Sequence, residues 1–147
     1  MAPRQIYINI PVANLSAAID FYLALGFTQN KMFSDTNSAC VVLSDVIHVM
    51  LHEPTRFTTW VPEGKTTADA KKHTEVLLCV SAESREEVDD WVTKAQKAGG
   101  VADPTKLQEN PGMHCRSFED LDGHVWEVAY MDMSQWRKEQ KGDEEAK

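Results

Sequence analysis

A strand-like segment near the C-terminus, residues 123–130, carries one carboxylate among apolar residues. Side chains alternate between the two faces of a strand, so Val125, Glu127 and Ala129 share a face, and the bulkier residues between them share the other. A carboxylate buried on such a face needs a cation, a metal or a hydrogen-bond donor as its partner. Glu127 is therefore a candidate for chemistry, and the structural alternative is an ion pair with an arginine such as Arg116.

Two further strand-like segments place polar groups at a spacing of two residues. Tyr7 and Asn9 share one strand face, and His48, Met50 and His52 share another. An asparagine in this position can bind a substrate oxygen or complete a hydrogen bond between strands. The histidines can contact a substrate or merely line a pocket. Elsewhere, Arg116 is a candidate for binding a substrate carboxylate, as an alternative to a salt bridge.

The elements that must position these residues occur twice along the chain. In the first half, a strand near residue 6 leads to a helix that Asn14 can cap and Gly26 can end, and strands follow at about 28–34, 39–44 and 46–52. In the second half, a strand at 75–80 leads to a helix with a Ser84 capping box, and strands follow at about 101–107, 114–119 and 124–130. Each half is predicted to be a βαβββ module.

We therefore predict an α+β fold in which two βαβββ modules form a curved, mixed-sheet cup with the helices outside. The predicted domain covers residues 1–132, with module one at about 1–53 and module two at about 74–132. The polar connection between them, about 54–73, holds Phe57 and Trp60, which could close over the cup as a lid or pack against a second subunit. Residues 133–147 are predicted to form a C-terminal helix and a charged tail.

The composition limits the partners that we expect. The net charge is −8 and no cluster of Lys and Arg follows a phosphate backbone, so nucleic acid is an unexpected partner. We expect no membrane partner either, because the chain lacks an apolar stretch of roughly 18 residues. Three cysteines without a Cys-x-x-Cys pair indicate reduced thiols and a cytoplasmic location. We expect a homodimer, because the exposed edges of each module invite pairing.

Two motifs resemble a known family. Residues 118–128, Phe-Glu-Asp-Leu-Asp-Gly-His-Val-Trp-Glu-Val, are similar to the closing hairpin of the vicinal oxygen chelate (glyoxalase, bleomycin resistance and dioxygenase) superfamily. Residues 10–15, Ile-Pro-Val-Ala-Asn-Leu, with the Phe-Tyr and Leu-Gly-Phe that follow, resemble its opening strand, helix and glycine turn. The chain is most similar to the small lactoylglutathione-lyase-like members.

The resemblance implies four metal-ligand positions in the cup. They fall on Tyr7, Met50, Glu75 and Glu127, of which Glu127 matches the family, Glu75 is a plausible replacement, and the first two are poor ligands for Zn or Ni. A site with His52 or His48 in place of the missing ligand, beside Glu75 and Glu127, would leave open positions on a catalytic metal.

The resemblance also implies two functions. The first is a glyoxalase-like lyase or isomerase that acts on a small oxygenated substrate, with a divalent metal such as Zn or Ni and with Glu127 as the catalytic residue. In that case Tyr7, Asn9, His48, Met50 and Arg116 would bind the substrate. The alternative is a metal-free protein of the bleomycin-resistance type, which binds a small molecule without chemistry. Tyr7 and Met50 at the ligand positions favour the alternative.

Overall fold

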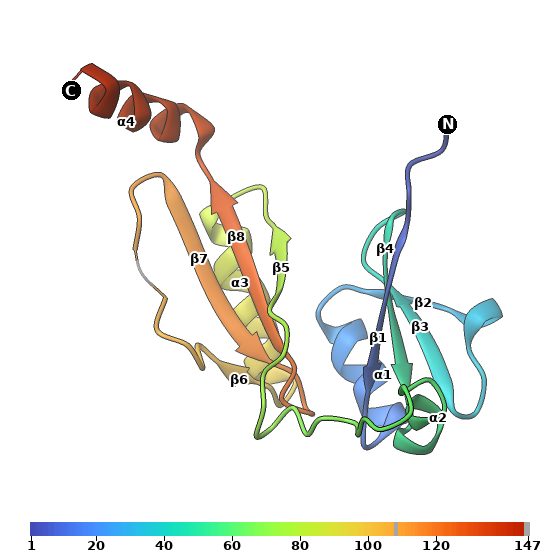
Figure 1. Cartoon of the computed structure of the whole chain (residues 1–147). Helices are drawn as coiled ribbons and strands as arrows, with labels where there is room; N and C mark the ends of the chain where they lie inside the picture. The colour runs from blue at the N-terminus through green and yellow to red at the C-terminus, as the bar shows by residue number, and fades with distance from the viewer. Residues whose placement is uncertain (108, 146–147) are drawn as a thin grey trace. The chain divides into compact units, whose positions relative to one another are not determined.

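A computed structural model describes residues 1–107 and 109–145 of the chain. The chain forms two compact units. The first unit comprises Met1–Thr74 together with Asp120–His124, and the second comprises Glu75–Glu119 and the chain from Val125 onward. The elements of both units are labelled in Figure 1, and each unit is described by itself below.

The first unit is a four-stranded sheet in the order β1-β4-β3-β2. Strand β1 is parallel to β4, and β3 is antiparallel to both β4 and β2. Its elements are β1 (Ile6–Pro11), α1 (Leu15–Ala24), β2 (Thr28–Asn30), the 3-10 helix η1 (Lys31–Phe33), β3 (Ser38–Val42), β4 (Ile47–His52) and α2 (Pro54–Thr58). The predicted first module is therefore present.

Helix α1 packs on one face of this sheet. The side chain of Asn14 accepts a hydrogen bond from the amide of Ala17 at 3.0 Å, which is the predicted N-cap. Gly26, with a φ of +101°, follows the helix as expected for a residue in the left-handed region. The core of this face consists of buried residues from α1, β3 and β4, namely Leu15, Ala18, Phe21, Tyr22, Ala39, Val41, Val49 and Leu51. The opposite face of the sheet is thus the one that α1 leaves uncovered.

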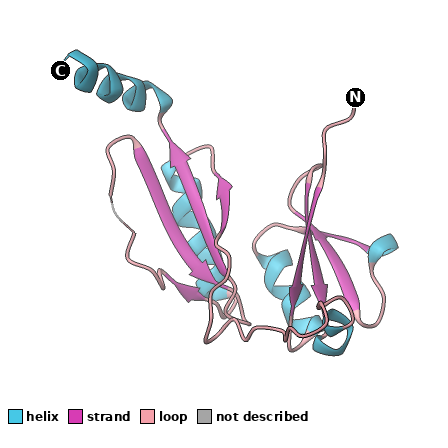
Figure 2. Cartoon of the chain, in the orientation of Figure 1, coloured by secondary structure: helices cyan, strands magenta, loops and turns pink. Residues whose placement is uncertain are grey.

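The second unit repeats the plan with the strand order β5-β8-β7-β6. Helix α3 packs against β7 and β8 (Figure 2), and the ring of Trp91 on the helix lies 6.3 Å from that of Phe118 on β7. The amide of Glu87 donates to the Ser84 hydroxyl at 3.1 Å, as the capping box predicts. The elements are β5 (Leu78–Ser81), α3 (Arg85–Lys97), β6 (Val101–Ala102), β7 (Met113–Glu119), β8 (Val125–Met131) and α4 (Met133–Glu145).

The tip of the β7–β8 hairpin, Asp120–His124, belongs to the first unit. The Tyr22 hydroxyl donates to Asp120 Oδ2 at 2.6 Å, and both residues are buried. The amide of Ala13 donates to Asp122 Oδ1 at 2.8 Å, and His124 Nε2 donates to the Pro11 carbonyl at 2.7 Å. This cluster fixes the hairpin tip on the loop between β1 and α1.

The α+β class and the two βαβββ modules are confirmed, but several expectations about single elements were wrong. The strand expected at about 28–34 ends at Asn30, where η1 begins. Strand β5 begins at Leu78, so Glu75 precedes the strand instead of opening it. Strand β6 has 2 residues, because the chain leaves the edge of β7 after Ala102. Helix α2 was missed, although Pro54 at its first position is a known start signal. Among the described residues, no helix combines the length and the apolar character that crossing a membrane requires.

Candidate functional site

The face of the first sheet that points away from α1 brings together five residues that the sequence singled out. Residues directly opposite each other on paired strands share a face, and the register pairs Tyr7 with His48, Asn9 with Met50, and Pro11 with His52. Strand β3 adds Ser38 opposite His52 and Cys40 opposite Met50. We call Tyr7, Asn9, His48, Met50 and His52, with Ser38 and Cys40, the polar face. The sequence predicted two groups, Tyr7 with Asn9 and His48 with Met50 and His52, and the pairing of β1 with β4 places both groups on this face.

His52 has hydrogen-bond partners at both ring nitrogens. Its Nδ1 lies 2.6 Å from the Ser38 hydroxyl, and its Nε2 lies 2.7 Å from Asn9 Oδ1. The amide nitrogen of Asn9 donates to the carbonyl of Tyr7 at 3.1 Å, which directs Oδ1 toward the histidine. An amide oxygen only accepts, so Nε2 carries the proton and Nδ1 accepts from Ser38. In its neutral form His52 therefore has no lone pair left for a metal.

The connection after β4 covers His52. The ring of Trp60 lies 4.7 Å from the His52 ring and that of Phe57 lies 6.4 Å from it. Arg56 lies over Trp60 at 5.8 Å and pairs with Asp35 at 2.7 Å. Burial, followed by the positive charge of Arg56, lowers the pKa of His52 below its ordinary value. The two aromatic rings thus lie against His52, and their suggested role as a lid over a cup stays a prediction.

His48 differs from His52 in its surroundings. Only 8% of the residue is exposed, yet neither Nδ1 nor Nε2 has a hydrogen-bond partner among the described residues. Its ring stacks on that of Tyr7, with centroids 4.6 Å apart and planes at 11°. The Tyr7 hydroxyl donates to Gln5 Oε1 at 2.8 Å and so is directed away from the imidazole. His48 is the one histidine of the polar face with free ring nitrogens.

Glu127 lies on the face of the second sheet that points away from α3. On the other face, Arg116 of β7 reaches Asp89 of α3, and Arg116 is opposite Val128 on β8. Alternation therefore turns Glu127 to the open face, where its cross-strand neighbours are Cys79 and Ser117. This agrees with the orientation expected of a site residue.

The two thiols on that open face are weak nucleophiles. Burial raises the pKa of Cys115 to about 11, and the neighbouring Cys79 and Glu127 act in the same direction. Burial, followed by the charge of Glu127, also raises the pKa of Cys79. Because a thiol reacts as the thiolate, neither group is activated at neutral pH.

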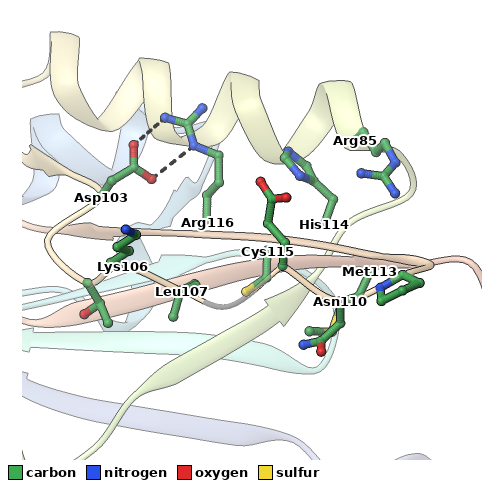
Figure 3. Close-up of a pocket in the computed structure, with 12 residues that line it drawn as sticks. Arg85, Asp103, Lys106, Leu107, Asn110, Met113, His114, Cys115 and Arg116 are labelled. Atoms are coloured by element: carbon green, nitrogen blue, oxygen red, sulfur yellow. Dashed lines mark hydrogen bonds and ion pairs between the residues drawn. The ribbon is translucent and has the colours of Figure 1, made fainter.

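Arg116 lines a pocket of about 670 Å³ at the edge of β7 (Figure 3). Its Nε and Nη2 donate to the carboxylate of Asp103 at 3.1 and 2.6 Å, and its Nη1 donates to Asp89 at 3.0 Å. His114 Nε2 shares the same oxygen of Asp89 at 2.9 Å. The arginine is thus ion-paired, on the opposite face of the sheet from Glu127, and its predicted role in substrate binding stays a prediction.

The residues at the family's ligand positions do not fit a bound metal ion. Tyr7 is stacked on a histidine, Met50 offers only a thioether, and both nitrogens of His52 are taken. Glu75 is exposed and lies outside β5. Within the described part of the chain, no group of three His, Cys, Asp or Glu side chains is placed to hold a metal ion. These residues therefore support no reaction step through a metal ion. Among the predicted metal ligands, Glu127 is the one whose side chain lies on the open face of its sheet.

Sequence reasoning missed Ser38, which completes the His52 network. Its signal was weak: Ser38 lies one residue before the strand predicted at about 39–44, whereas β3 begins at Ser38 and so places it on the same face as Cys40. Which of the two faces that is depends on the pairing of β3 with β4, which the sequence does not specify.

Comparison with known proteins identifies the family. The model of the Glyoxalase/Bleomycin resistance protein/Dioxygenase superfamily matches residues 4–128, so the chain belongs to that superfamily. No curated protein matches the chain.

Solved structures share the fold. The hypothetical protein SA1046 from S. aureus is 25% identical, with a TM-score of 0.71, and the match covers 88% of this chain and 95% of that chain. The fosfomycin resistance protein FosX from Listeria monocytogenes is 15% identical (TM-score 0.63; 92% and 98% covered). A lactoylglutathione lyase from Agrobacterium tumefaciens is 18% identical (TM-score 0.62; 88% and 95% covered).

Proposed function

We propose that this chain is a metal-independent small-molecule-binding protein of the bleomycin-resistance type, which uses the polar face of the first sheet. The observation that carries the proposal is the state of His52. Its two ring nitrogens are bound by Ser38 and Asn9, and Tyr7 and Met50 stand at the other positions where a metal ligand would be needed. The polar face therefore offers a bound molecule aromatic surface and hydrogen-bonding groups, and it does not offer ligands for a metal ion.

The side chains of this face suit an aromatic ligand. Tyr7 is 45% exposed and Trp60 is 58% exposed, so both rings present area that a flat molecule can cover. Tyr7 is paired with His48, and Trp60 lies on His52, four residues further along β4. Four residues of a strand span about 13 Å, with the thioether of Met50 between the two ends. A molecule of one or two rings matches this length.

A glyoxalase-like lyase or isomerase is the second candidate, and one observation favours it. Glu127 is half-buried on the open face of the second sheet, where a carboxylate can take a proton from a bound substrate. In this alternative Glu127 is the catalytic base.

Thermal shift measurements with a panel of small aromatic compounds, in the presence of a chelator, test the proposal. We expect at least one compound to raise the melting temperature, and we expect Trp60→Ala to weaken its binding. Leu23→Ala is the matched control, because Leu23 is an exposed apolar residue of α1, on the other side of the same sheet.

Turnover of the hemithioacetal of methylglyoxal and glutathione, with Ni or Zn added, tests the second candidate. We expect no turnover above the background. Turnover that Glu127→Gln abolishes would overturn the binding proposal in favour of the enzyme.

A further inference from the structure

The pocket at the edge of β7 exists because the strand beside it is short. Strand β6 pairs with β7 only at Glu119 and Phe118, and the chain then leaves that edge. The described residues of the connection from β6 to β7, with Arg85 of α3 and residues of β7, line a hollow of about 670 Å³ (Figure 3). Small-molecule sites have volumes of about 300–1,000 Å³, so this hollow is large enough for a ligand.

Two cations of this pocket have no partner in the described chain. Arg116 is held by the carboxylate of Asp103 at 2.6 and 3.1 Å, so its charge is compensated. The side chains of Arg85 and Lys106 also line the pocket, and neither has an ion pair or a hydrogen bond within the described part of the chain. Among the described lining residues, Glu109 is the only acidic one that is likewise unpaired. The unpaired charges of the lining are therefore two positive and one negative, in a chain whose net charge is −8.

The arrangement of the two cations indicates the chemistry of a ligand. Figure 3 shows Arg85 and Lys106 at opposite ends of the pocket, the first on α3 and the second on the connection. Guanidinium and ammonium groups both bind carboxylates, and a guanidinium can do so with two parallel hydrogen bonds. Leu107 and Met113 are half-buried in the same lining and supply apolar surface for a hydrocarbon chain. A molecule with one acidic group satisfies only one of the two ends.

We propose that this pocket binds a small dicarboxylic acid, a molecule with a carboxylate at each end of a short hydrocarbon chain. One carboxylate pairs with Arg85 and the other with Lys106. The pocket belongs to the second unit, whereas the polar face belongs to the first, so the proposed function of that face does not depend on this site. The charge of Glu109 opposes the binding of a dianion, and this residue therefore limits the affinity.

Calorimetric titration with adipate and with hexanoate, at low salt, tests the site. Hexanoate has the same carbon chain but one carboxylate, and we expect adipate to bind about threefold to fivefold more tightly. Arg85→Gln and Lys106→Gln should each weaken the binding of adipate by about the same factor, and Glu109→Gln should strengthen it. Lys97→Gln is the matched control, because Lys97 is an exposed lysine at the other end of α3, and we expect it to leave the affinity unchanged. An affinity for adipate that Glu109→Gln does not raise would contradict the proposal.

A measurement on the unmodified chain locates the bound adipate. Met113 is one of six methionines, and its methyl resonance should move when adipate is added, whereas that of Met32, an exposed residue of the first unit, should not. Equal affinities for adipate and hexanoate would overturn the proposal, as would a loss in Lys97→Gln as large as the losses in Arg85→Gln and Lys106→Gln. The proposal also fails if neither acid binds, or if adipate binds while the methyl resonance of Met113 stays unchanged.

Discussion

Replacing Tyr22 with Phe tests whether the buried hydrogen bond to Asp120 stabilises the first unit. The change removes a single oxygen, which lies 2.6 Å from Asp120 Oδ2, and leaves the ring packing in place. Asp120 keeps its other contacts, because the amides of Asp122 and His124 donate to Oδ1 at 3.0 and 2.9 Å. The variant therefore isolates one donor to one carboxylate oxygen.

The magnitude follows from the burial of both partners. Tyr22 is 1% exposed and Asp120 is 4% exposed, so water cannot replace the lost donor. A hydrogen bond to a charged group contributes about 1.5–3 kcal/mol, and we expect Tyr22→Phe to lower the free energy of unfolding by that amount. Tyr7→Phe is the control, because its hydroxyl bonds the exposed Gln5, and we expect a change of less than about 0.5 kcal/mol.

The deficit of Tyr22→Phe should depend on pH. Burial raises the pKa of Asp120 above its ordinary value of 3.8, and the Tyr22 hydrogen bond opposes this rise. A carboxyl with a raised pKa in the folded state favours folding below 3.8, and this contribution is lost as the pH rises through the folded pKa. Removing the hydroxyl raises that pKa further, so the deficit should be larger at neutral pH than in acid.

Urea unfolding of the two single variants and of the double variant with Asp120→Asn measures the coupling. We expect a coupling energy above about 1 kcal/mol at neutral pH. A coupling near zero, or a Tyr22→Phe variant as stable as the Tyr7→Phe control, would refute the role assigned to this hydrogen bond.

Three further predictions concern stability. Gly123→Ala should destabilise the chain by more than Gly64→Ala. Both residues have positive φ, which costs an alanine about 1–2 kcal/mol, but only at Gly123 would the new Cβ meet backbone atoms, at 2.8–2.9 Å from Ala70 and Lys71. Equal melting temperatures for the two variants would contradict this prediction. Ser84→Ala should cost about 1 kcal/mol through loss of the α3 cap, whereas Ser16→Ala on the exposed side of α1 should cost much less, as thermal unfolding can check. The pKa of His52 is lower in the folded chain than its ordinary value of 6.5. As the pH falls below 6.5, the imidazole is therefore protonated in the unfolded chain before it is protonated in the folded chain. The free energy of unfolding should decrease from that pH down through the folded pKa. In His52→Gln the urea concentration at the unfolding midpoint should depend less on pH in this range. A slope equal to that of the wild type would contradict the role assigned to His52.

The fold was largely predictable because its signals are local. Asn14 and Ser84 cap helices whose buried faces follow the helical period, and Gly26 ends the first of them. The boundary of β5 was wrong because Val76 and Leu77 continue the apolar, strand-like pattern, whereas the pairing of β5 with β8 begins only at Leu78, opposite Trp126. Register is a property of two strands together, so neither strand alone specifies it.

The candidate site was predictable only in part for the same reason. Alternation placed Tyr7 with Asn9, and His48 with His52, on one face each, but the parallel pairing of β1 with β4 combines the two pairs on one face of the sheet. The different states of the two histidines were not predictable. They depend on Ser38, from a third strand, and on the tautomer that Asn9 imposes on His52. The ion pairs of Arg116 with Asp103 and Asp89 were not predictable, because these partners are distant from it in the sequence.

The most direct test of whether binding needs a metal is calorimetric titration of the protein with an aromatic compound that binds to it. The titration is run on protein freed of metal with a chelator, and again after Ni or Zn is added. With His52 held by Ser38 and Asn9, we predict the same dissociation constant with and without the metal, in both the wild type and Glu127→Gln. Binding that appears only after the metal is added, and that Glu127→Gln removes, would contradict the account.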